Sequence, residues 1–171
     1  MSRNESQVRA FQTTSDACPI PAAIELIGER WTCLILRASI LGLQHFEEYQ
    51  ACLGIARNIL SDRLARLVSG GILERSADPN DRRRVVYALT ARGAALLPVL
   101  VALRQWAIDQ GLGTRSHPVL ADRRDRRPLA RLEVTAHDGR VVGLEDLVWV
   151  GQDGEELDLP VASERQRREA A

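Results

Sequence analysis

The segment from Gly54 to Thr90 constrains the fold of this chain more than any other part of its sequence. It reads GIARNILSDRLARLVSGGILERSADPNDRRRVVYALT. Three leucines recur at helical spacing, which predicts a helix with one apolar face. They are Leu60, Leu64 and Leu67. Glycine adopts a left-handed cap at little cost, so Gly70 and Gly71 should end this helix.

A hairpin is predicted directly after the helix. Ile72, Leu73 and Glu74 begin one strand, and the β-prone run VVYAL at residues 85–89 forms the return strand. The run DPND that starts at Asp78 is turn chemistry, because proline presets one dihedral angle and Asp and Asn bond their own backbone. This order is typical of a winged helix-turn-helix domain, in which a helix fills the major groove of duplex DNA and a basic hairpin holds the flanking phosphates.

The predicted DNA contacts lie on a recognition helix at about residues 56–70 and on a basic wing at residues 77–84. They are Arg57, Asn58, Ser61, Asp62, Arg63, Arg66, Arg82, Arg83 and Arg84. Side chains alternate along a strand, so two of the three wing arginines are expected to reach the DNA. Two alternatives stay open: an ordinary helix and hairpin with a solvated charge run, and a winged-helix protein-interaction module that does not bind DNA.

Charge is distributed unevenly along the chain. Its 23 basic and 23 acidic residues give a net charge of +0, so the overall charge indicates no polyanionic partner. Residues 55–84, however, hold seven arginines and four acids, an excess of +3, whereas residues 1–54 carry −2. The positive excess therefore coincides with the predicted DNA-binding segment, as an electrostatic footprint on DNA should. All basic residues are arginine, a bias that we attribute to genome composition.

The expected fold class is mainly α (α+β), with a winged helix-turn-helix domain, a long helix for dimerisation and a small β extension. The expected parts are a flexible N-terminal arm (1–17), the DNA-binding and dimerisation domain (18–110), a linker (111–128), a β-hairpin extension (129–160) and a polar tail (161–171). In the extension, strands are expected on either side of two turns, HDG at residues 137–139 and GQDG at residues 151–154.

Further helices are expected inside the winged domain. Residues 19–27 predict a short helix, residues 31–41 are apolar enough for the central core helix, and residues 45–53 predict the first helix of the helix-turn-helix. A long helix at residues 91–110 follows the hairpin, and Pro98 should kink it or mark an offset start.

The long helix carries more apolar surface than a small domain can cover. The residues concerned are Leu96, Val99, Leu100, Leu103 and Trp106. They could form a seam between two copies of the chain, or pack on their own domain or on the extension. Operator-binding domains of this type usually act as two-fold dimers, which favours a homodimer.

Nothing in the sequence indicates an enzyme, a metal site or a cofactor. It contains no GxSxG elbow, P-loop or HExxH motif. The three histidines, His45, His117 and His137, are expected on the surface. The cysteines lack a CxxC pair, which favours reduced thiols over a disulfide or a zinc site. A thiol-dependent enzyme built on Cys18 or Cys52 ranks last, because no base lies nearby in sequence.

A cytoplasmic location without membrane contact is expected. The N-terminal run MSRNESQVRAFQTTSDA is polar and lacks the apolar core of a signal peptide. No uninterrupted apolar run approaches the ~18 residues that span a bilayer.

The segment from Cys18 to about Trp106 resembles the HxlR-type winged helix-turn-helix transcriptional regulators. The resemblance rests on the Cys-Pro start, the segment GERWTCLIL and the close YALTARGAAL. It implies a cytoplasmic homodimeric regulator whose recognition helix begins near Arg57 and whose dimer contacts come from the first helix and the long helix after the wing.

The resemblance also suggests a signal. Some members of the family sense oxidants or electrophiles through the N-terminal cysteine, here Cys18, although a small packed cysteine without a role is an equally good interpretation. A small-molecule effector bound elsewhere, with Trp106 and Trp149 in its site, is the other possibility. Ala56 departs from the serine or threonine common in the family, so the recognition helix has a weaker N-cap.

Overall fold

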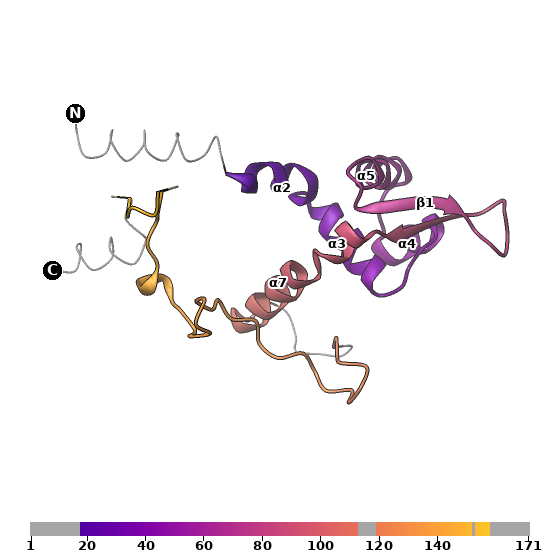
Figure 1. The fold of residues 1–171 in the computed structure, drawn as a ribbon. Helices are drawn as coiled ribbons and strands as arrows, with labels where there is room; N and C mark the ends of the chain where they lie inside the picture. Colours follow the sequence, from indigo (N-terminus) through magenta and orange to yellow (C-terminus); the bar gives the residue numbers. More distant parts are fainter. Residues whose placement is uncertain (1–17, 113–118, 152, 158–171) are drawn as a thin grey trace. The chain divides into compact units, whose positions relative to one another are not determined.

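The computed structural model describes residues 18–112, 119–151 and 153–157 of the chain. They fall into two compact units (Figure 1). One unit spans residues 19–130, and the other holds the remaining described residues. The predicted arm and tail and His117 lie outside the described residues.

The unit at residues 19–130 has a winged-helix fold, so the predicted α+β class is confirmed. Its elements in chain order are α2 (Pro19–Ile27), α3 (Arg30–Ile40), α4 (Phe46–Leu53), α5 (Arg57–Ser69), β1 (Leu73–Ala77), β2 (Val85–Leu89), α6 (Ala91–Ala94) and α7 (Leu97–Asp109). The predicted helices and the return strand are all present, with ends that shift by about a residue.

The core of this unit lies where α3, α4 and α5 meet the base of the hairpin. Its fully buried side chains are Ile35, Leu36, Tyr49, Leu60, Leu64, Leu67 and Leu73. Burying one such leucine contributes about 1.5–3 kcal/mol relative to leaving it exposed. The Tyr49 hydroxyl is satisfied inside the core, because it donates to the Leu43 carbonyl at 2.6 Å. The core residues therefore fix the angle between the two helices of the helix-turn-helix.

The turn between α4 and α5 depends on a glycine. Gly54 ends α4 with a φ of +61°, in the left-handed region that glycine enters without steric cost. Its backbone N–H still bonds the Gln50 carbonyl at 3.0 Å, so α4 closes cleanly before the chain turns into α5.

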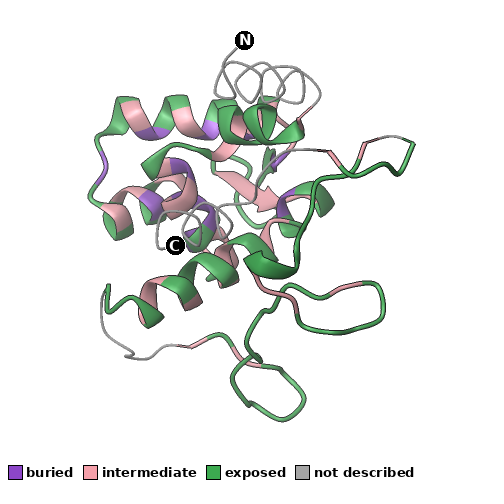
Figure 2. Cartoon of the chain, turned by 90° about the vertical axis from the view of Figure 1, so that its left-hand side faces the viewer, coloured by how far each residue is buried: buried purple, intermediate pink, exposed green. Residues whose placement is uncertain are grey.

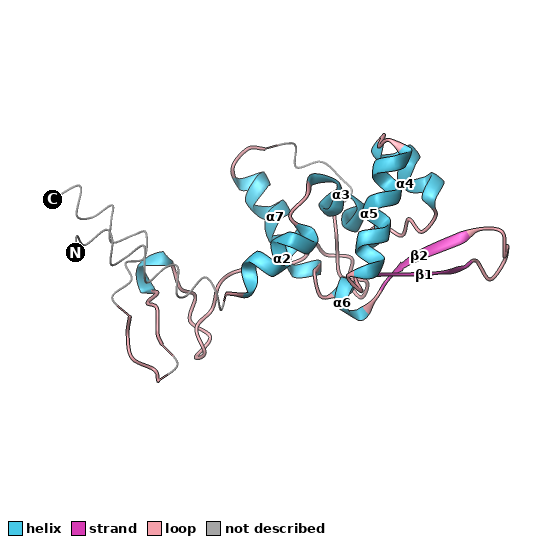
Figure 3. Ribbon diagram, turned by 90° about the horizontal axis from the view of Figure 1, so that it is seen from above, coloured by secondary structure: helices cyan, strands magenta, loops and turns pink. Residues whose placement is uncertain are grey.

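The hairpin projects beyond the helices (Figures 1 and 3). β1 and β2 pair antiparallel in a register that runs from Leu73↔Leu89 at the base to Ala77↔Val85 near the tip. At the base, a Cβ on Gly93 of α6 would lie 2.2 Å from the Ile72 carbonyl oxygen, so only glycine fits. This close approach anchors the hairpin on α6.

The long helix predicted after the hairpin is interrupted. It consists of α6 and α7, and Pro98 lies in the first turn of α7. Proline is tolerated there because that N–H has no helical partner in any case, so the prediction of an offset start is confirmed. In Figure 2, buried residues occur along the core helices, whereas α7 carries none.

The stretch Ala91–Asp109 corrects one expectation. It is a 19-residue helical segment that is long and apolar enough to cross a membrane by length and composition alone. A search for uninterrupted apolar runs misses it, because Arg92 and Arg104 break the run while the average stays apolar. A charged side chain such as Arg104 is costly inside a bilayer.

The second unit contains turns instead of the predicted strands. Thr135 and Val141 form one isolated bridge across the turn at Gly139, and Val150 and Glu156 form another across the turn at Gly154. Backbone bonds beside them, such as Val142 N to Val134 O at 2.9 Å, hold the chain reversals. The reversals were therefore predicted well, but within the described residues each pairing is too short for a strand, and a short 3₁₀ turn at Leu144–Asp146 was not expected.

Candidate nucleic-acid interface

The exposed face of α5 carries most of the polar side chains predicted to contact DNA. Its opposite face is filled by the leucines of the core, which turns the polar positions outward. The exposed candidates are Arg57, Asn58, Ser61, Asp62 and Arg66, whereas Arg63 is half-buried. The sequence pattern therefore placed the outward face correctly, with Arg63 at its edge.

Arg57 lies at the start of α5 and rests on a neighbouring helix. Its guanidinium carbon lies 4.9 Å from the centre of the Phe46 ring. Contacts of this kind are modestly stabilising at exposed sites. The preceding residue, Ala56, provides no side-chain cap to α5. Phe46 thus orients Arg57 at the end of the helix that would enter a groove.

Two arginines of α5 form a cluster of ion pairs with carboxylates. Arg63 Nη2 lies 2.5 Å from Glu29 Oε2 at the start of α3, and Arg63 Nη1 lies 3.5 Å from Asp62 Oδ2. Arg66 Nε is 3.4 Å from the same Asp62 oxygen. The Arg63 side chain is only 19% exposed, whereas that of Arg66 is 63% exposed. Arg63 therefore fastens α5 to α3, and Arg66 remains accessible.

The three wing arginines lie in the turn before β2 and not on the strand. The turn is held by its own acids: the Asp81 carboxylate accepts from Arg83 N at 3.0 Å, and the Asp78 carboxylate accepts from Asn80 N at 2.8 Å. Arg82, Arg83 and Arg84 are exposed, and no other described residue pairs with their guanidinium groups. Strand alternation therefore does not limit which of them can face a ligand, and that part of the sequence argument was wrong.

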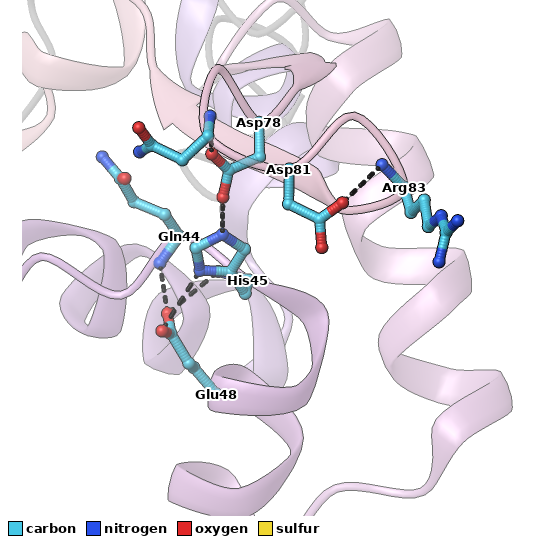
Figure 4. Close-up of polar contacts among 7 residues, drawn as sticks. Gln44, His45, Glu48, Asp78, Asp81 and Arg83 are labelled. Carbon is cyan, nitrogen blue, oxygen red and sulfur yellow. Dashed lines mark hydrogen bonds and ion pairs between the residues drawn. The ribbon is translucent and has the colours of Figure 1, made fainter.

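His45 connects the helix-turn-helix to the wing (Figure 4). It is the N-cap residue of α4, and its Nε2 lies 2.9 Å from Asp78 Oδ2 at the end of β1. Its Nδ1 lies 3.1 Å from Glu48 Oε1. Carboxylates only accept hydrogen bonds, so both contacts are made together only when both ring nitrogens donate, as in the imidazolium. We name His45, Asp78 and Glu48 the wing clasp.

Backbone pairing supports the wing clasp. Tyr87 N donates to Gln44 O at 2.8 Å, and His45 forms an isolated bridge with Val86. The chain just before α4 thus runs beside β2 as a short third element of the hairpin. The angle of the wing is therefore set by contacts with the first helix of the helix-turn-helix.

The clasp shifts the ionisation of all its members. The hydrogen bond from Asp78 raises the pKa of His45, and Glu48 adds to this while Arg84 opposes it. Backbone N–H groups of Gln44 and His45 lower the pKa of Glu48 to about 2. The Asn80 N–H, and then His45, lower the pKa of Asp78.

Sequence reasoning missed this role of His45, which it assigned to the surface. Its side chain is in fact only 15% exposed. The signal was weak, because Asp78 is far along the chain and reads as an ordinary turn residue. The capping-box spacing between His45 and Glu48 was visible, and the structure has that box.

The cysteines lie apart from this interface. Cys18 directly precedes α2, Cys33 lies in α3 and Cys52 is exposed on α4, and all three are free thiols. Burial raises the pKa of the Cys33 thiol, and its Sγ donates to the Ile27 carbonyl at 3.3 Å. Within the described residues, no group of three or more His, Cys, Asp or Glu side chains is arranged to hold a metal ion.

The fold and the exposed recognition face agree with a family profile. The profile described as HxlR-like helix-turn-helix matches residues 26–113, which include all of α3 to α7. The chain belongs to the HxlR-like helix-turn-helix family. The matched residues include the helix-turn-helix, the wing and the long helix.

Relatives of this HxlR-like protein are described as HTH-type transcriptional regulators, not as enzymes. Rv3095 of Mycobacterium tuberculosis is 44% identical over 84 residues, which is 49% of this chain and 53% of that protein. The chain thus spans about half the length of the mycobacterial relatives it matches. YvaP of Bacillus subtilis is 34% identical over 97 residues, which cover 56% of this chain and 90% of YvaP.

Solved structures of transcription factors share the fold. PA1607, a candidate transcription factor, is 39% identical with a TM-score of 0.73, over 80% of this chain and 95% of PA1607. The redox regulator HypR in its reduced form is 25% identical with a TM-score of 0.50, over 55% of this chain and 94% of HypR. The family assignment therefore identifies this chain as a helix-turn-helix protein of a transcriptional regulator family.

Proposed function

We propose that this protein is a homodimeric, sequence-specific DNA-binding regulator that acts in the cytoplasm. Residues 18–110 would form the DNA-binding and dimerisation domain, with residues 111–128 as a linker to the extension. The observation that carries the proposal is the pairing of an exposed polar face on α5 with an unpaired arginine turn on the same domain. A helix and a basic hairpin of this kind suit a major groove and its flanking phosphates.

The N-terminal half of α5 is the part assigned to base readout. Arg57, Asn58, Ser61 and Asp62 are exposed there. A bidentate contact from arginine to guanine or from asparagine to adenine is worth about 1–3 kcal/mol of discrimination. Asp62 shares its carboxylate with two arginines, so its role in our proposal is to orient Arg66.

The apolar faces of α2 and α7 are assigned to the dimer. Neither helix has a buried residue within the protomer. Ile20, Ile24, Leu103 and Trp106 are all 49–61% exposed. Large apolar side chains gathered on an exposed face commonly mark a protein interface. A two-fold dimer would also present two recognition helices to two half-sites.

Selection of binding sequences from random duplex DNA tests the function. The wild type should enrich a two-fold symmetric motif, and Asn58→Ala should lose preference at a single base pair of each half-site. Ser69→Ala, at the far end of the same helix, is the matched control and should select the wild-type motif. Failure of the wild type to enrich any motif would reject DNA recognition and favour a protein-interaction module.

Oxidant sensing through Cys18 is a second candidate function. HypR is described as a redox regulator with reduced and oxidised forms, and Cys18 directly precedes the first helix of the winged domain. A thiol at a helix start can be activated by the N–H groups. We expect diamide to release the wild type from its operator and to leave Cys18→Ser bound. Cys52→Ser is the control for an exposed thiol, and equal release of Cys18→Ser and wild type would remove Cys18 as the sensor.

A further inference from the structure

We propose that a cavity between α3 and α7 binds an organic anion with an apolar body, such as a medium-chain carboxylic acid. The cavity has a volume of about 440 Å³. Small-molecule sites typically have volumes of 300–1,000 Å³ and apolar walls with a few polar groups. The volume therefore suits a small ligand.

Three segments of the unit at residues 19–130 line the cavity. α3 provides one wall, which includes Leu34 and Ile40, and α7 provides the facing wall, which includes Val101 and Ile108. Val119 and Leu120 lie along a third side. The hollow is thus bounded on several sides and differs from the open face of α7 that carries Val99 and Trp106.

The charged groups of the lining have a single sign. Arg37 of α3 and Arg104 of α7 line the cavity, and no acidic residue does. Both arginines are exposed, and neither pairs with any other described residue. Guanidinium groups bind carboxylates through charge-assisted, often bidentate, hydrogen bonds. Two unpaired guanidinium groups beside apolar walls therefore select a ligand with an acidic head and an apolar body.

The remaining polar candidate in the lining supports an apolar interior. Cys33 lines the cavity, and burial raises the pKa of its thiol. A neutral thiol behaves as a small hydrophobic group. Cys33 thus belongs to the walls and does not repel an anion.

The position of the cavity suggests an effect on DNA binding, and this consequence rests on the proposed function. α3 contacts α4 and α5 as well as α7. A ligand between α3 and α7 would therefore touch the helix on which the helix-turn-helix is built. Binding of the ligand itself does not depend on DNA and can be measured without it.

Calorimetric titration of the full chain with decanoate and with decanol tests the proposal. Decanoate should bind the wild type, and the double variant Arg37→Gln/Arg104→Gln should weaken its binding about tenfold or more, because charge-assisted hydrogen bonds are lost. Decanol, which lacks the charge, should bind both proteins equally weakly. Arg30→Gln changes an arginine of α3 that does not line the cavity and should bind decanoate like the wild type.

Three results would overturn the proposal. Decanoate could fail to bind, or it could bind the wild type and the double variant equally. Binding could also appear only when the protein is diluted to monomers, which would show that a second copy fills the cavity. None of these results bears on DNA recognition, so the proposed function would stand or fall separately.

Discussion

Two helices of equal length, α5 and α7, use their apolar residues in different ways. Each has 13 residues. α5 buries Leu60, Leu64 and Leu67 inside the protomer, whereas α7 buries none of its residues although it is the more apolar helix. The winged core is complete within one chain, and the long helix is not.

This difference separates the two tasks of a dimeric regulator. Because the apolar face of α5 is satisfied, its polar face is free to meet a ligand in solvent. Because the outer face of α7 is unsatisfied, we assign it to a second copy of the chain. The two helices should therefore respond oppositely to folding and to association experiments.

The largest expected effect separates the two helices by their contribution to folding. Leu64→Ala should lower the free energy of unfolding by about 2–5 kcal/mol, because it leaves a cavity in the core. Leu103→Ala, the same change at a residue that is 49% exposed, should cost far less. Urea denaturation at a protein concentration low enough to favour monomers measures both. Equal losses would break the comparison, since α7 would then have a buried face within the protomer.

A second prediction concerns association. Trp106→Glu should raise the dissociation constant of the dimer about 30-fold or more, because large aromatic residues at interfaces often contribute 2 kcal/mol or more. Trp106 is 54% exposed in the protomer. Analytical ultracentrifugation measures the effect. The matched control is Val134→Glu, at a residue 65% exposed in the other unit. A dimer unchanged by Trp106→Glu would place the interface elsewhere.

The smallest effect concerns the wing clasp and its pH dependence. The pKa of His45 is raised above its ordinary 6.5, so its contribution to stability is complete below pH 6.5 and is lost as the pH rises through the folded-state value. The pKa of Asp78 is lowered from 3.8, so its contribution is present above pH 3.8 and is lost in stronger acid. The clasp is therefore strongest between these two values.

Asp78→Asn tests the clasp without removing the oxygen that accepts from Asn80. The free energy of unfolding of the wild type should exceed that of the variant by more at pH 6 than at pH 8, and NMR titration should give a lower pKa for His45 in the variant. Asp81→Asn, in the same turn but without contact to His45, is the control. An unchanged His45 pKa in Asp78→Asn would refute the clasp.

Local patterns made much of this fold predictable. The leucine spacing of α5, the glycines after it and the turn chemistry at Asp78 each act within a few residues, so the sequence gives direct signals for them. Pro98 likewise marked the start of α7, because the position of proline in a helix is a local constraint. The outward face of α5 followed from the buried one.

Long-range contacts could not be predicted in the same way. The pairs His45–Asp78 and Arg63–Glu29 join residues 33 and 34 positions apart, and nothing in either local pattern indicates the partner. The cavity at α3 and α7 likewise depends on tertiary packing. In the extension, good turn signals were mistaken for strands, because a turn predicts a chain reversal but not the length of the pairing that follows.

The most direct test of the central claim, that α5 and the wing bind DNA together, is the salt dependence of operator affinity. Replacing Arg82, Arg83 and Arg84 with alanine should flatten the slope of log affinity against log salt by roughly two units, because phosphate contacts are lost. Alanine at Arg123, Arg124 and Arg126, three exposed arginines of another turn, is the matched control and should leave the slope unchanged. Equal slopes for the wild type and the wing variant would place the wing off the DNA and contradict the account.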